Sequence, residues 1–555
     1  MEFAGVYHKT SEQMSYPLDE ERLVINLKTG YDVKRVFIHH GDPFEAGILG
    51  GNEKWTGKRE EIVYKKRLPH QLWWTTTLIP PYKRCKYYFE LQTEKEVWYY
   101  FEDGFLTEEQ INMDGRMLQC FTVLWMNPAD VNRTPEWVNS TVWYQIFPDR
   151  FCNGTPEKKD ADIVPWQTGK VTNKEKYGGD LEGIRRKLPY LQDLGITGIY
   201  LNPIMEAETN HKSDTTDYTK IDPSFGDDGT MRHLVSEAHD RGIRIMVDAV
   251  FNHCGRKFAP WLDVQEKGRE STYADWMPKL NTNNEEVIRY FCQVCEGWIR
   301  KYDIDGIRFD VGNEVSHRFL KRMREHLKKI KPDIYLLGEI WHDASQWLTG
   351  DEYDSVMNYP LMSGIHDFFL DQTMGKEEFE NMVNRCYTMY MQQNNNVLFN
   401  LLDSHDTERL MNRFHDLDKF YQQLAVLFTL PGSPCIYYGT EIAMEGGFDP
   451  DCRRCMPWDE IGSEENRERI GQMKKLIPLR KEEETFRSLH FHFPGNYENP
   501  RCVEYIKLDE EGQKTEILLN CSEVPVKVKG TGEVLFACNY QNGILEKNGT
   551  LIRRT

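Results

Sequence analysis

Three carboxylates follow short apolar runs that resemble one another in length and composition. Asp310 follows the run 306–309, Glu339 follows the run 336–338, and Asp406 comes soon after a third run. A buried strand that presents an acid at its C-terminal tip is how a (β/α)8 barrel builds an active site. Two such carboxyl groups about 5 Å apart can cleave a glycosidic bond with retention, one as nucleophile and the other as proton donor.

The spacing of these residues suggests that the acids have different catalytic roles. Asp310 and Glu339 are one strand–helix–strand step apart, so we expect them on adjacent strand tips. Arg308 lies two residues before Asp310, on the same strand face, where its charge would keep that acid ionised. Glu339 must stay protonated to act as an acid, which requires burial and a neighbouring negative charge. Trp341, two residues further on, would supply an apolar wall.

Two further polar groups end predicted strands. The stretch Asp248–His253 ends one, and His405 with Asp406 ends another. A strand-end group of this kind either closes a turn or grips sugar hydroxyls. Any one acid alone could equally be a helix cap or a salt-bridge partner, but three acids on strand tips favour an active site.

The apolar runs divide the 555 residues into three folded regions. Residues 1–125 are predicted to form an all-β sandwich, 126–140 a linker, 141–483 a catalytic (β/α)8 TIM barrel, and 484–555 a second all-β sandwich. We expect α-helices between most of the barrel strands, with starts at Asp180 and Asn284. The eight predicted barrel strands are 142–147, 198–202, 244–249, 306–310, 335–339, 355–359, 397–403 and 435–438.

Composition narrows the partners and the compartment. The formal net charge is −19, from 88 acids and 69 bases, which argues against nucleic acid or an anionic membrane as partner. There is no stretch of about 18 apolar residues and no apolar leader at the N-terminus. The 13 cysteines are an odd number, which favours reduced thiols and a cytoplasmic location.

Several motifs resemble those of a known family. Asp248–His253, Gly306–Asp310, Gly338–Glu339 and Ser404–Asp406 resemble the four signature regions of the α-amylase family, glycoside hydrolase family thirteen. The stretch Met277–Asn281 resembles a fifth region, that of the neopullulanase, cyclomaltodextrinase and maltogenic amylase group. The N-terminal region is similar to the starch-binding-type domain of that group, so the resemblance covers nearly the whole chain.

The resemblance implies a role for each matching residue. Asp310 corresponds to the nucleophile, Glu339 to the general acid/base, and Asp406 to a third acid that binds the distorted sugar. The substrate-binding residues that it implies are His211, His253, Arg308, His405, Asp449 and Arg453, with Glu314 and Trp341 on the leaving-group side.

The sequence departs from the family pattern in three places. Ser213 stands where the family carries a tyrosine that stacks under the cleaved sugar. The span 254–276 shortens the loop domain after the third strand, which predicts a more open cleft and better tolerance of branched or polymeric glucans. In the third place, the family's calcium loop, Asn153, Gly178 and Asp180 remain.

The calcium loop has lost most of its expected ligands. Thr155, Lys158 and Lys159 stand where oxygen ligands are expected, and a hard cation needs six or more oxygens. We therefore expect that the protein requires no cofactor, with calcium held by Asn153, Gly178 and Asp180 as the alternative.

The expected activity is cleavage of α-1,4-glucosidic bonds in cyclodextrins, maltooligosaccharides, pullulan and starch, with some transfer to sugar acceptors. An α-glucanotransferase or α-glucosidase on the same scaffold remains an alternative, as does a non-catalytic glucan-binding protein, which would have no need of the acid trio. The resemblance also implies a homodimer formed through the N-terminal domain.

Overall fold

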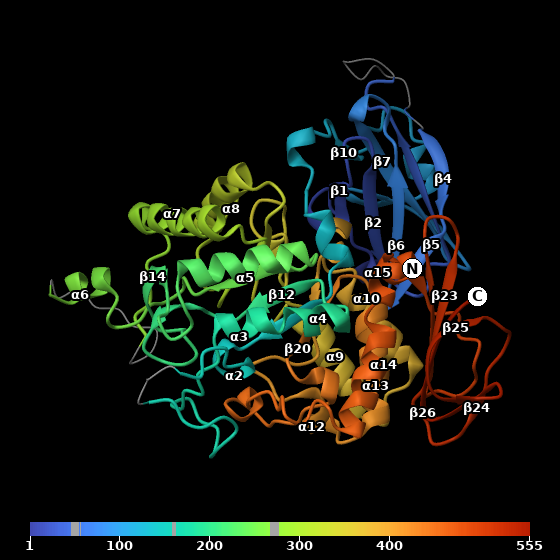
Figure 1. Cartoon of the computed structure of the whole chain (residues 1–555). Helices are drawn as coiled ribbons and strands as arrows, with labels where there is room; N and C mark the ends of the chain where they lie inside the picture. Colours follow the sequence, from blue (N-terminus) through green and yellow to red (C-terminus); the bar gives the residue numbers. More distant parts are fainter. Residues whose placement is uncertain (46–54, 56, 158–161, 267–276) are drawn as a thin grey trace. The chain divides into compact units, whose positions relative to one another are not determined.

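The structure is a computed structural model that describes residues 1–45, 55, 57–157, 162–266 and 277–555. It divides into two compact units. The first contains residues 1–133 together with 348–350 and 377–393, and the second contains the rest of the chain. Figure 1 shows the chain coloured along its sequence.

The first unit is a β-sandwich, as predicted. Its strands are β1 (Ser15–Pro17), β2 (Leu23–Thr29), β3 (Arg35–Gly41), β4 (Lys58–Ile62), β5 (Tyr64–Leu68), β6 (Gln71–Leu78), β7 (Cys85–Gln92), β8 (Val97–Phe101), β9 (Gly104–Leu106) and β10 (Phe121–Val123). It also contains the short helix α1 (Glu108–Ile111) and, in the later segment, α10 (Lys376–Cys386). One sheet has the order β1-β2-β6-β5, and the other has the order β4-β3-β7-β8-β9 with β10 beside β7. Inward-facing residues such as Ile25, Ile38 and Phe89 join in one buried apolar cluster.

The first unit takes in a segment from much later in the chain. The backbone N–H of Gln392 donates to the Tyr16 hydroxyl at 3.1 Å. The side-chain amide of Gln393 donates to the carbonyl oxygens of Pro17 and Leu18, at 3.0 and 2.9 Å. The edge strand β1 is therefore anchored by a segment that lies far from it in sequence.

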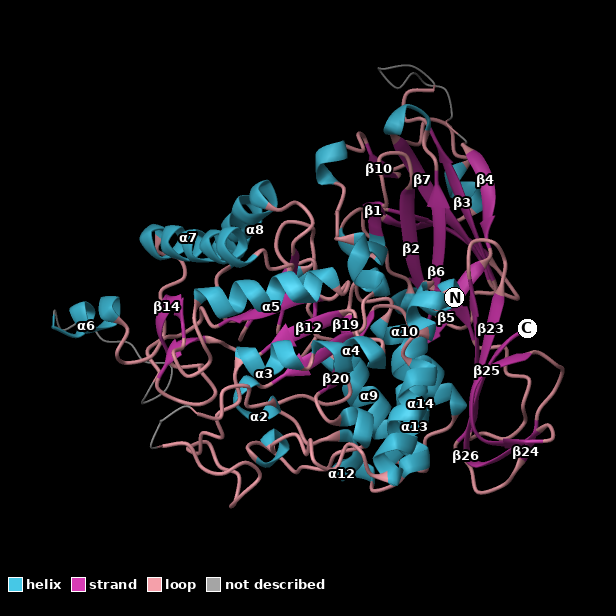
Figure 2. Cartoon of the chain, viewed as in Figure 1, coloured by secondary structure: helices cyan, strands magenta, loops and turns pink. Residues whose placement is uncertain are grey.

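The second unit contains a closed parallel barrel. Figure 2 distinguishes strands, in magenta, from helices, in cyan. The barrel strands are β11 (Trp143–Ile146), β12 (Gly198–Leu201), β15 (Arg244–Ala249), β16 (Gly306–Phe309), β17 (Tyr335–Gly338), β18 (Ser355–Val356), β19 (Phe399–Asn400) and β20 (Ser433–Tyr437). All eight match predicted strands, although β18 and β19 are much shorter than expected. The sheet order runs β18-β17-β16-β15-β12-β11-β20-β19, and a parallel bridge from Met357 to Phe399 joins its two ends.

Helices alternate with the barrel strands at most positions. They are α2 (Pro148–Phe151), α3 (Leu181–Arg186), α4 (Leu188–Leu194), α5 (Asp228–Asp240), α6 (Ala259–Glu266), α7 (Glu285–Tyr302), α8 (His317–Ile330), α9 (Tyr359–Leu370), α11 (Gln392–Asn396), α12 (Leu410–Phe414), α13 (Leu417–Thr429), α14 (Glu464–Leu476), α15 (Leu479–Glu482) and α16 (Glu484–Arg487). A short hairpin of β13 (Met205–Ala207) and β14 (Thr215–Ile221) follows β12. Among the described residues, the step from β17 to β18 contains only a 3-10 turn, Ser345–Trp347.

The predicted helix starts are confirmed. The Asp180 side chain accepts the backbone N–H of Gly183 at 2.7 Å and so caps α3. Asn284 caps α7 by accepting from the backbone of Glu286 at 2.8 Å. Each cap satisfies N–H groups that a helix start leaves without partners inside the helix.

The interior of the barrel is a packed core. Large buried side chains from several strands fill it, including Trp143, Tyr200, Met246, Tyr335 and Phe399. A barrel filled in this way is no pore, so chemistry must take place at the strand ends. The loop after β15 was predicted to be short. Its residues 267–276 lie outside the described part of the chain.

The C-terminal strands form one hydrogen-bonded sheet. They are β21 (His490–His492), β22 (Cys502–Leu508), β23 (Lys514–Asn520), β24 (Val526–Lys527), β25 (Glu533–Gln541) and β26 (Ile544–Arg554). The order is β21-β22-β23-β26-β24, and β25 also pairs with β26. The Gln422 side chain on α13 donates to the carbonyl oxygens of Asn520 and Gly549, both at 3.1 Å, which ties the sheet to the barrel helices.

Candidate active site

The barrel brings all three predicted acids to its C-terminal end. Asp310 directly follows β16 and Glu339 directly follows β17, while Asp406 lies in the loop after β19. The backbone N–H groups of Asp310 and Glu339 donate to Ala249 and Phe309 on neighbouring strands, both at 3.0 Å. The strand ladder therefore continues to the acids themselves and fixes their backbone. The two carboxyl groups contact the same guanidinium, that of Arg308, at 2.8 and 3.0 Å, so they lie near one another as a retaining pair requires.

One guanidinium serves several acids at once. Arg308 is fully buried, and its Nη1 lies 2.9 Å from Asp248 and 2.8 Å from Asp310. Its Nη2 lies 3.0 Å from Glu339. Sequence reasoning paired Arg308 with Asp310 alone, but the structure gives it three carboxylate neighbours. Because one cation faces several buried acids, the site holds an excess of negative charge that favours proton uptake.

The protonation of the central pair differs from the expectation. Burial, followed by the negative charge of Glu339, raises the pKa of Asp310 well above its usual range. Burial is also the largest effect on Glu339 and acts in the same direction. The charge of Arg308 and the hydrogen bonds that Glu339 accepts together outweigh burial, so the pKa of Glu339 is lowered. Glu339 also accepts from the Val311 backbone and the Trp341 ring, each at 2.9 Å. The two acids titrate as a coupled pair, so the proton belongs to the pair.

Asp406 is a second proton-holding group. Its carboxylate accepts from Arg453 Nη2 at 3.1 Å, and His405 Nε2 lies 3.1 Å away. Burial, with a further contribution from the charge of Glu339, raises the pKa of Asp406 to about 7. Asp406 therefore changes its charge close to neutral pH.

Neutral imidazoles surround this third acid. The rings of His211 and His405 stack with 5.3 Å between centroids. Burial lowers the pKa of both rings well below the usual value. Burial also lowers the pKa of His253 to about 4, and this ring makes a hydrogen bond with the backbone of Ser213. Neutral rings both donate and accept, which suits sugar hydroxyls.

A cation is poorly suited to the cluster at Asp406. One ligand atom from each of His211, His405 and Asp406 lies within 4.8 Å of the others. The neighbouring guanidinium of Arg453 would repel a cation bound among them. We therefore treat these three residues as polar contacts for a neutral substrate.

The remaining predicted contacts lie around the acids. Trp341 is 47% exposed and its ring stacks on buried Tyr359, with 3.8 Å between centroids and 9° between planes. This gives a rigid aromatic face of the kind on which sugars stack. Asp449 forms an ion pair with Arg453 at 3.0 Å, and Glu314 lies 3.4 Å from the ammonium group of Lys279.

Sequence reasoning missed Tyr359 and Lys279. Tyr359 is the last residue of a predicted strand but begins α9 in the structure. The only sequence feature that could have identified Tyr359 is an aromatic residue at the end of a predicted strand. Lys279 donates to the side chain of Asn252 and, at 3.1 Å, to the backbone oxygen of Glu314, and it thereby ties together the loops after β15 and β16. The sequence feature that could have identified Lys279 is its position in the fifth motif.

The predicted calcium ligands do not suit a hard cation. Asp180 already accepts from the backbone of Gly154 at 2.9 Å, from Gly183 and from the hydroxyl of Thr155. Asn153 accepts from the Thr155 backbone at 3.1 Å, and its amide lies beside Gly178. Protein donors therefore fill the oxygens that an ion would need. Lys158 and Lys159 lie outside the described residues.

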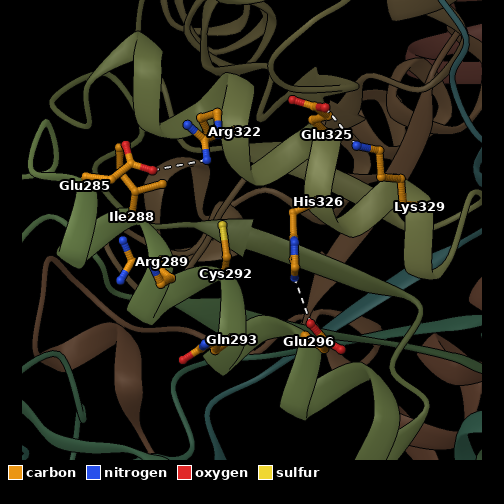
Figure 3. A pocket seen from close by; sticks show the side chains of 10 residues that line it. All are labelled: Glu285, Ile288, Arg289, Cys292, Gln293, Glu296, Arg322, Glu325, His326 and Lys329. Carbon is orange, nitrogen blue, oxygen red and sulfur yellow. Dashed lines mark hydrogen bonds and ion pairs between the residues drawn. The ribbon is translucent and has the colours of Figure 1, made fainter.

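A second polar hollow lies between α7 and α8, away from the strand ends (Figure 3). Its charges are paired with one another. Glu285 meets Arg322 at 3.1 Å, and Glu296 meets His326 at 2.8 Å. Because each acid has its own base at the surface, the groove has none of the charge imbalance that marks the strand-end site.

Comparison with known proteins identifies the family. The description "Alpha amylase, catalytic domain" matches residues 145–277 and 273–466, and "Alpha amylase, N-terminal ig-like domain" matches residues 1–124. The chain belongs to the α-amylase family. This α-amylase family member is therefore built from the catalytic barrel and the N-terminal domain that the motifs indicated.

Similar proteins match this family member over nearly its whole length. A maltogenic alpha-amylase of Bacillus acidopullulyticus is 39% identical over 98% of this chain and 97% of its own. An intracellular maltogenic amylase of Bacillus subtilis is 41% identical over 87% of this chain and 85% of its own. A solved cyclomaltodextrinase structure superposes with a TM-score of 0.88 at 34% identity, covering 100% of this chain and 98% of the other.

Proposed function

We propose that the protein is a retaining glycoside hydrolase that cleaves α-1,4-glucosidic bonds. Cyclodextrins, maltooligosaccharides, pullulan and starch are its substrates, and it transfers part of the product to sugar acceptors. The observation that carries the proposal is the acid trio of Asp310, Glu339 and Asp406 at the strand ends around Arg308. The names of the similar proteins, maltogenic amylase and cyclomaltodextrinase, support the substrate class.

The first step uses the coupled acids in opposite ways. A glycosidic oxygen placed against Glu339 receives the proton that the pair holds. Asp310 is then a carboxylate, 2.8 Å from Arg308, and attacks the anomeric carbon. The glycosidic C–O bond breaks, and the leaving sugar departs with the proton. Asp406 and the neutral rings of His211 and His405 hold hydroxyls of the distorted sugar.

The second step returns the enzyme to its starting state. Glu339, now a carboxylate, takes a proton from water, and the water oxygen displaces Asp310 from the anomeric carbon. A sugar hydroxyl in place of water gives transfer instead of hydrolysis. The exposed Trp341 ring, held flat on Tyr359, and the nearby Glu314 lie where an acceptor sugar would bind.

Product analysis tests the proposal and separates it from the alternatives. Purified protein is incubated with cyclodextrin, pullulan and starch, and the products are resolved by chromatography, with Asp310→Asn as the blank. Hydrolysis releases short maltooligosaccharides, whereas a glucanotransferase redistributes chain lengths without new reducing ends and an α-glucosidase releases glucose from chain ends. Wild-type protein that released no sugar beyond the blank would refute the hydrolase.

Location and assembly belong to the same proposal. We infer a cytoplasmic homodimer that associates through the N-terminal unit and requires no cofactor. The similar protein named as intracellular supports the location, and the described residues contain no helix suited in length and polarity to crossing a membrane. Ile79, Tyr82 and Trp125 are exposed apolar side chains of the N-terminal unit, and a backbone hydrogen bond from Met126 to Lys83 joins their segments. Sedimentation analysis of the wild-type protein and Trp125→Ser tests the dimer.

A further inference from the structure

A chain of buried polar side chains crosses the barrel interior, and the mechanism proposed above uses none of its central members. Gln145 lies on β11, Tyr200 on β12 and Asp248 on β15, and Asn202 directly follows β12. Gln145 Nε2 lies 3.0 Å from Asn202 Oδ1 and 2.8 Å from His405 Nδ1. Asn202 Nδ2 lies 3.4 Å from the Tyr200 hydroxyl, which lies 2.7 Å from Asp248 Oδ2.

The donors in this chain can point in only one direction. Arg308 donates to both oxygens of Asp248, at 2.9 and 3.0 Å, and a guanidinium accepts nothing. Asp248 is therefore an acceptor, and the Tyr200 hydroxyl donates to it. The Tyr200 oxygen then accepts from Asn202, so the carbonyl oxygen of Asn202 faces Gln145. Gln145 must present its NH2 group, whose two hydrogens match its two neighbours.

This direction determines which nitrogen of His405 carries the hydrogen. Burial and the nearby charge of Arg453 hold the pKa of His405 well below its usual range, so the ring is neutral. Its Nδ1 accepts from Gln145 and is therefore bare. The single ring hydrogen lies on Nε2, 3.1 Å from Asp406 Oδ2.

We infer that Gln145 is a positioning residue: its side-chain amide fixes the Nε2–H tautomer of His405, so that this ring donates to Asp406. The effect on rate rests on the proposed hydrolysis, whereas the tautomer is a property of the protein alone. Arg453 holds Asp406 from one side, and the His405 ring holds it from the other. The orientation of this ring depends on hydrogen bonds that begin at Arg308 and involve five strands: β16, β15, β12, β11 and β19 with its loop. One hydrogen-bond network thereby positions Asp406 as well as the other two acids, which contact Arg308 directly.

The ring nitrogens of His405 provide a test that needs no substrate. The protein is labelled with 15N histidine, and the His405 signals are assigned by their loss in His405→Asn. In the wild type at pH 7 we expect a protonated Nε2 and a bare Nδ1. In Gln145→Glu the carboxylate cannot donate, so both ring nitrogens become protonated. Met246→Leu, a volume-conserving change in the buried core of the barrel, should leave the signals unchanged.

Kinetics then connect the tautomer to catalysis. Gln145→Met keeps the length of the side chain but removes the donor, and we expect kcat/KM on maltotriose to fall about 100-fold through misplacement of the third acid. In the His405→Asn background the same change should cost less than about 3-fold, because the residue acts through that ring. Thermal unfolding of each variant gives the loss of stability for comparison with Met246→Leu.

Several outcomes would overturn the inference. Hydrogen on Nδ1 in the wild type, ring signals unchanged in Gln145→Glu, or losses in Gln145→Met and His405→Asn that simply add would each do so. A wild-type protein that released no sugar from any α-glucan would instead refute the proposed function, and the nitrogen signals would still decide the tautomer.

Discussion

Two of the charge clusters in the second unit differ in how their acids and bases are matched. In the groove between α7 and α8, Glu285 and Glu296 each meet a base at the surface. At the strand ends, buried Arg308 is shared by Asp248, Asp310 and Glu339. Paired surface charges are screened by water and contribute little to stability, whereas a buried excess of acid must take up protons.

The pKa shifts of the two clusters have opposite signs. In the groove, a hydrogen bond from Arg300, followed by one from His326, lowers the pKa of Glu296. At the strand ends, burial raises the pKa of Asp310 well above its usual range and that of Asp406 to about 7. A dense group of charges therefore does not by itself mark an active site. Unequal numbers of buried acids and bases are the better sign.

The largest effect is expected from Asp310→Asn. Loss of the nucleophile should lower kcat on maltotriose by about 10⁴-fold or more, because the substituted amide cannot form the covalent intermediate. Glu296→Gln makes the matching change in the groove and should keep full activity. Release of reducing sugar from both variants measures the difference. Activity of Asp310→Asn above 1% of the wild type would contradict the role of Asp310 as nucleophile, and with it the contrast to Glu296.

Removal of the shared cation should cost the most stability. Arg308→Met leaves Asp248, Asp310 and Glu339 buried without their base, and we expect a loss of about 3–5 kcal/mol in the free energy of unfolding. The pKa of Glu339 should rise, since the charge of Arg308 is the largest of the effects that lower it. Arg322→Met in the groove is the control, with a change within about 1 kcal/mol. Equal losses in urea titrations of the two variants would contradict the difference.

Stability should depend on pH through Asp406. Its pKa is about 7 in the folded protein and about 3.9 when unfolded, so the folded state binds this proton more tightly. The stability it contributes is complete below about pH 4 and is lost as the pH rises through about 7. Asp406→Asn stays neutral at every pH. Its free energy of unfolding should therefore gain about 4 kcal/mol relative to that of the wild type between pH 4 and pH 8. A difference independent of pH would refute the raised pKa.

Ser213→Tyr changes the apolar contacts of the site while leaving its charges as they are. Ser213 is buried beside His253, where the family carries a stacking tyrosine. An added aromatic face is worth about 1 kcal/mol, so kcat/KM on short maltooligosaccharides should rise about 5-fold. Ser213→Leu serves as a control for added bulk. An unchanged or lower kcat/KM in the tyrosine variant would refute the prediction that an aromatic side chain at this position improves activity.

The smallest effect is expected from Glu296→Gln. Its lowered pKa contributes stability above about pH 4.5 that is lost as the pH falls, the reverse of Asp406. Because the pair with His326 is at the surface, the loss at pH 7 should stay within about 0.5 kcal/mol. A larger loss in urea unfolding at pH 7, or a loss that shrank as the pH rose through about 4.5, would show that the groove is not a screened surface cluster.

The sequence was sufficient to predict the barrel and the positions of the acids. Strands such as β16 and β17 are continuous apolar runs because both faces are buried, and an acid directly after each run must lie at the strand tip. The short strands β18 and β19 were overestimated because apolar loop residues continue their pattern. Strands β21 and β26 do not stand out in the sequence, because β21 is only three residues long and a polar stretch around Lys547 interrupts β26.

The state of the site could not be predicted in the same way. Local spacing paired Arg308 with Asp310, but the positions of Asp248 and Glu339 depend on three neighbouring strands in register. A pKa shift arises from burial and from all nearby charges, so it needs the tertiary structure. Gln145 lacked any signal, because a lone polar residue in an apolar strand shows its partners only in three dimensions.

The segment 377–393 has a consequence for how the chain is made. Tyr16, Pro17 and Leu18 bond to Gln392 and Gln393, which are synthesised only after the first six barrel strands. Since domains emerge from the ribosome N-terminus first, the opening sandwich must wait with one edge incomplete while most of the next domain is translated. A fragment cut at residue 133 would keep that exposed edge permanently, which makes it prone to pair with other chains.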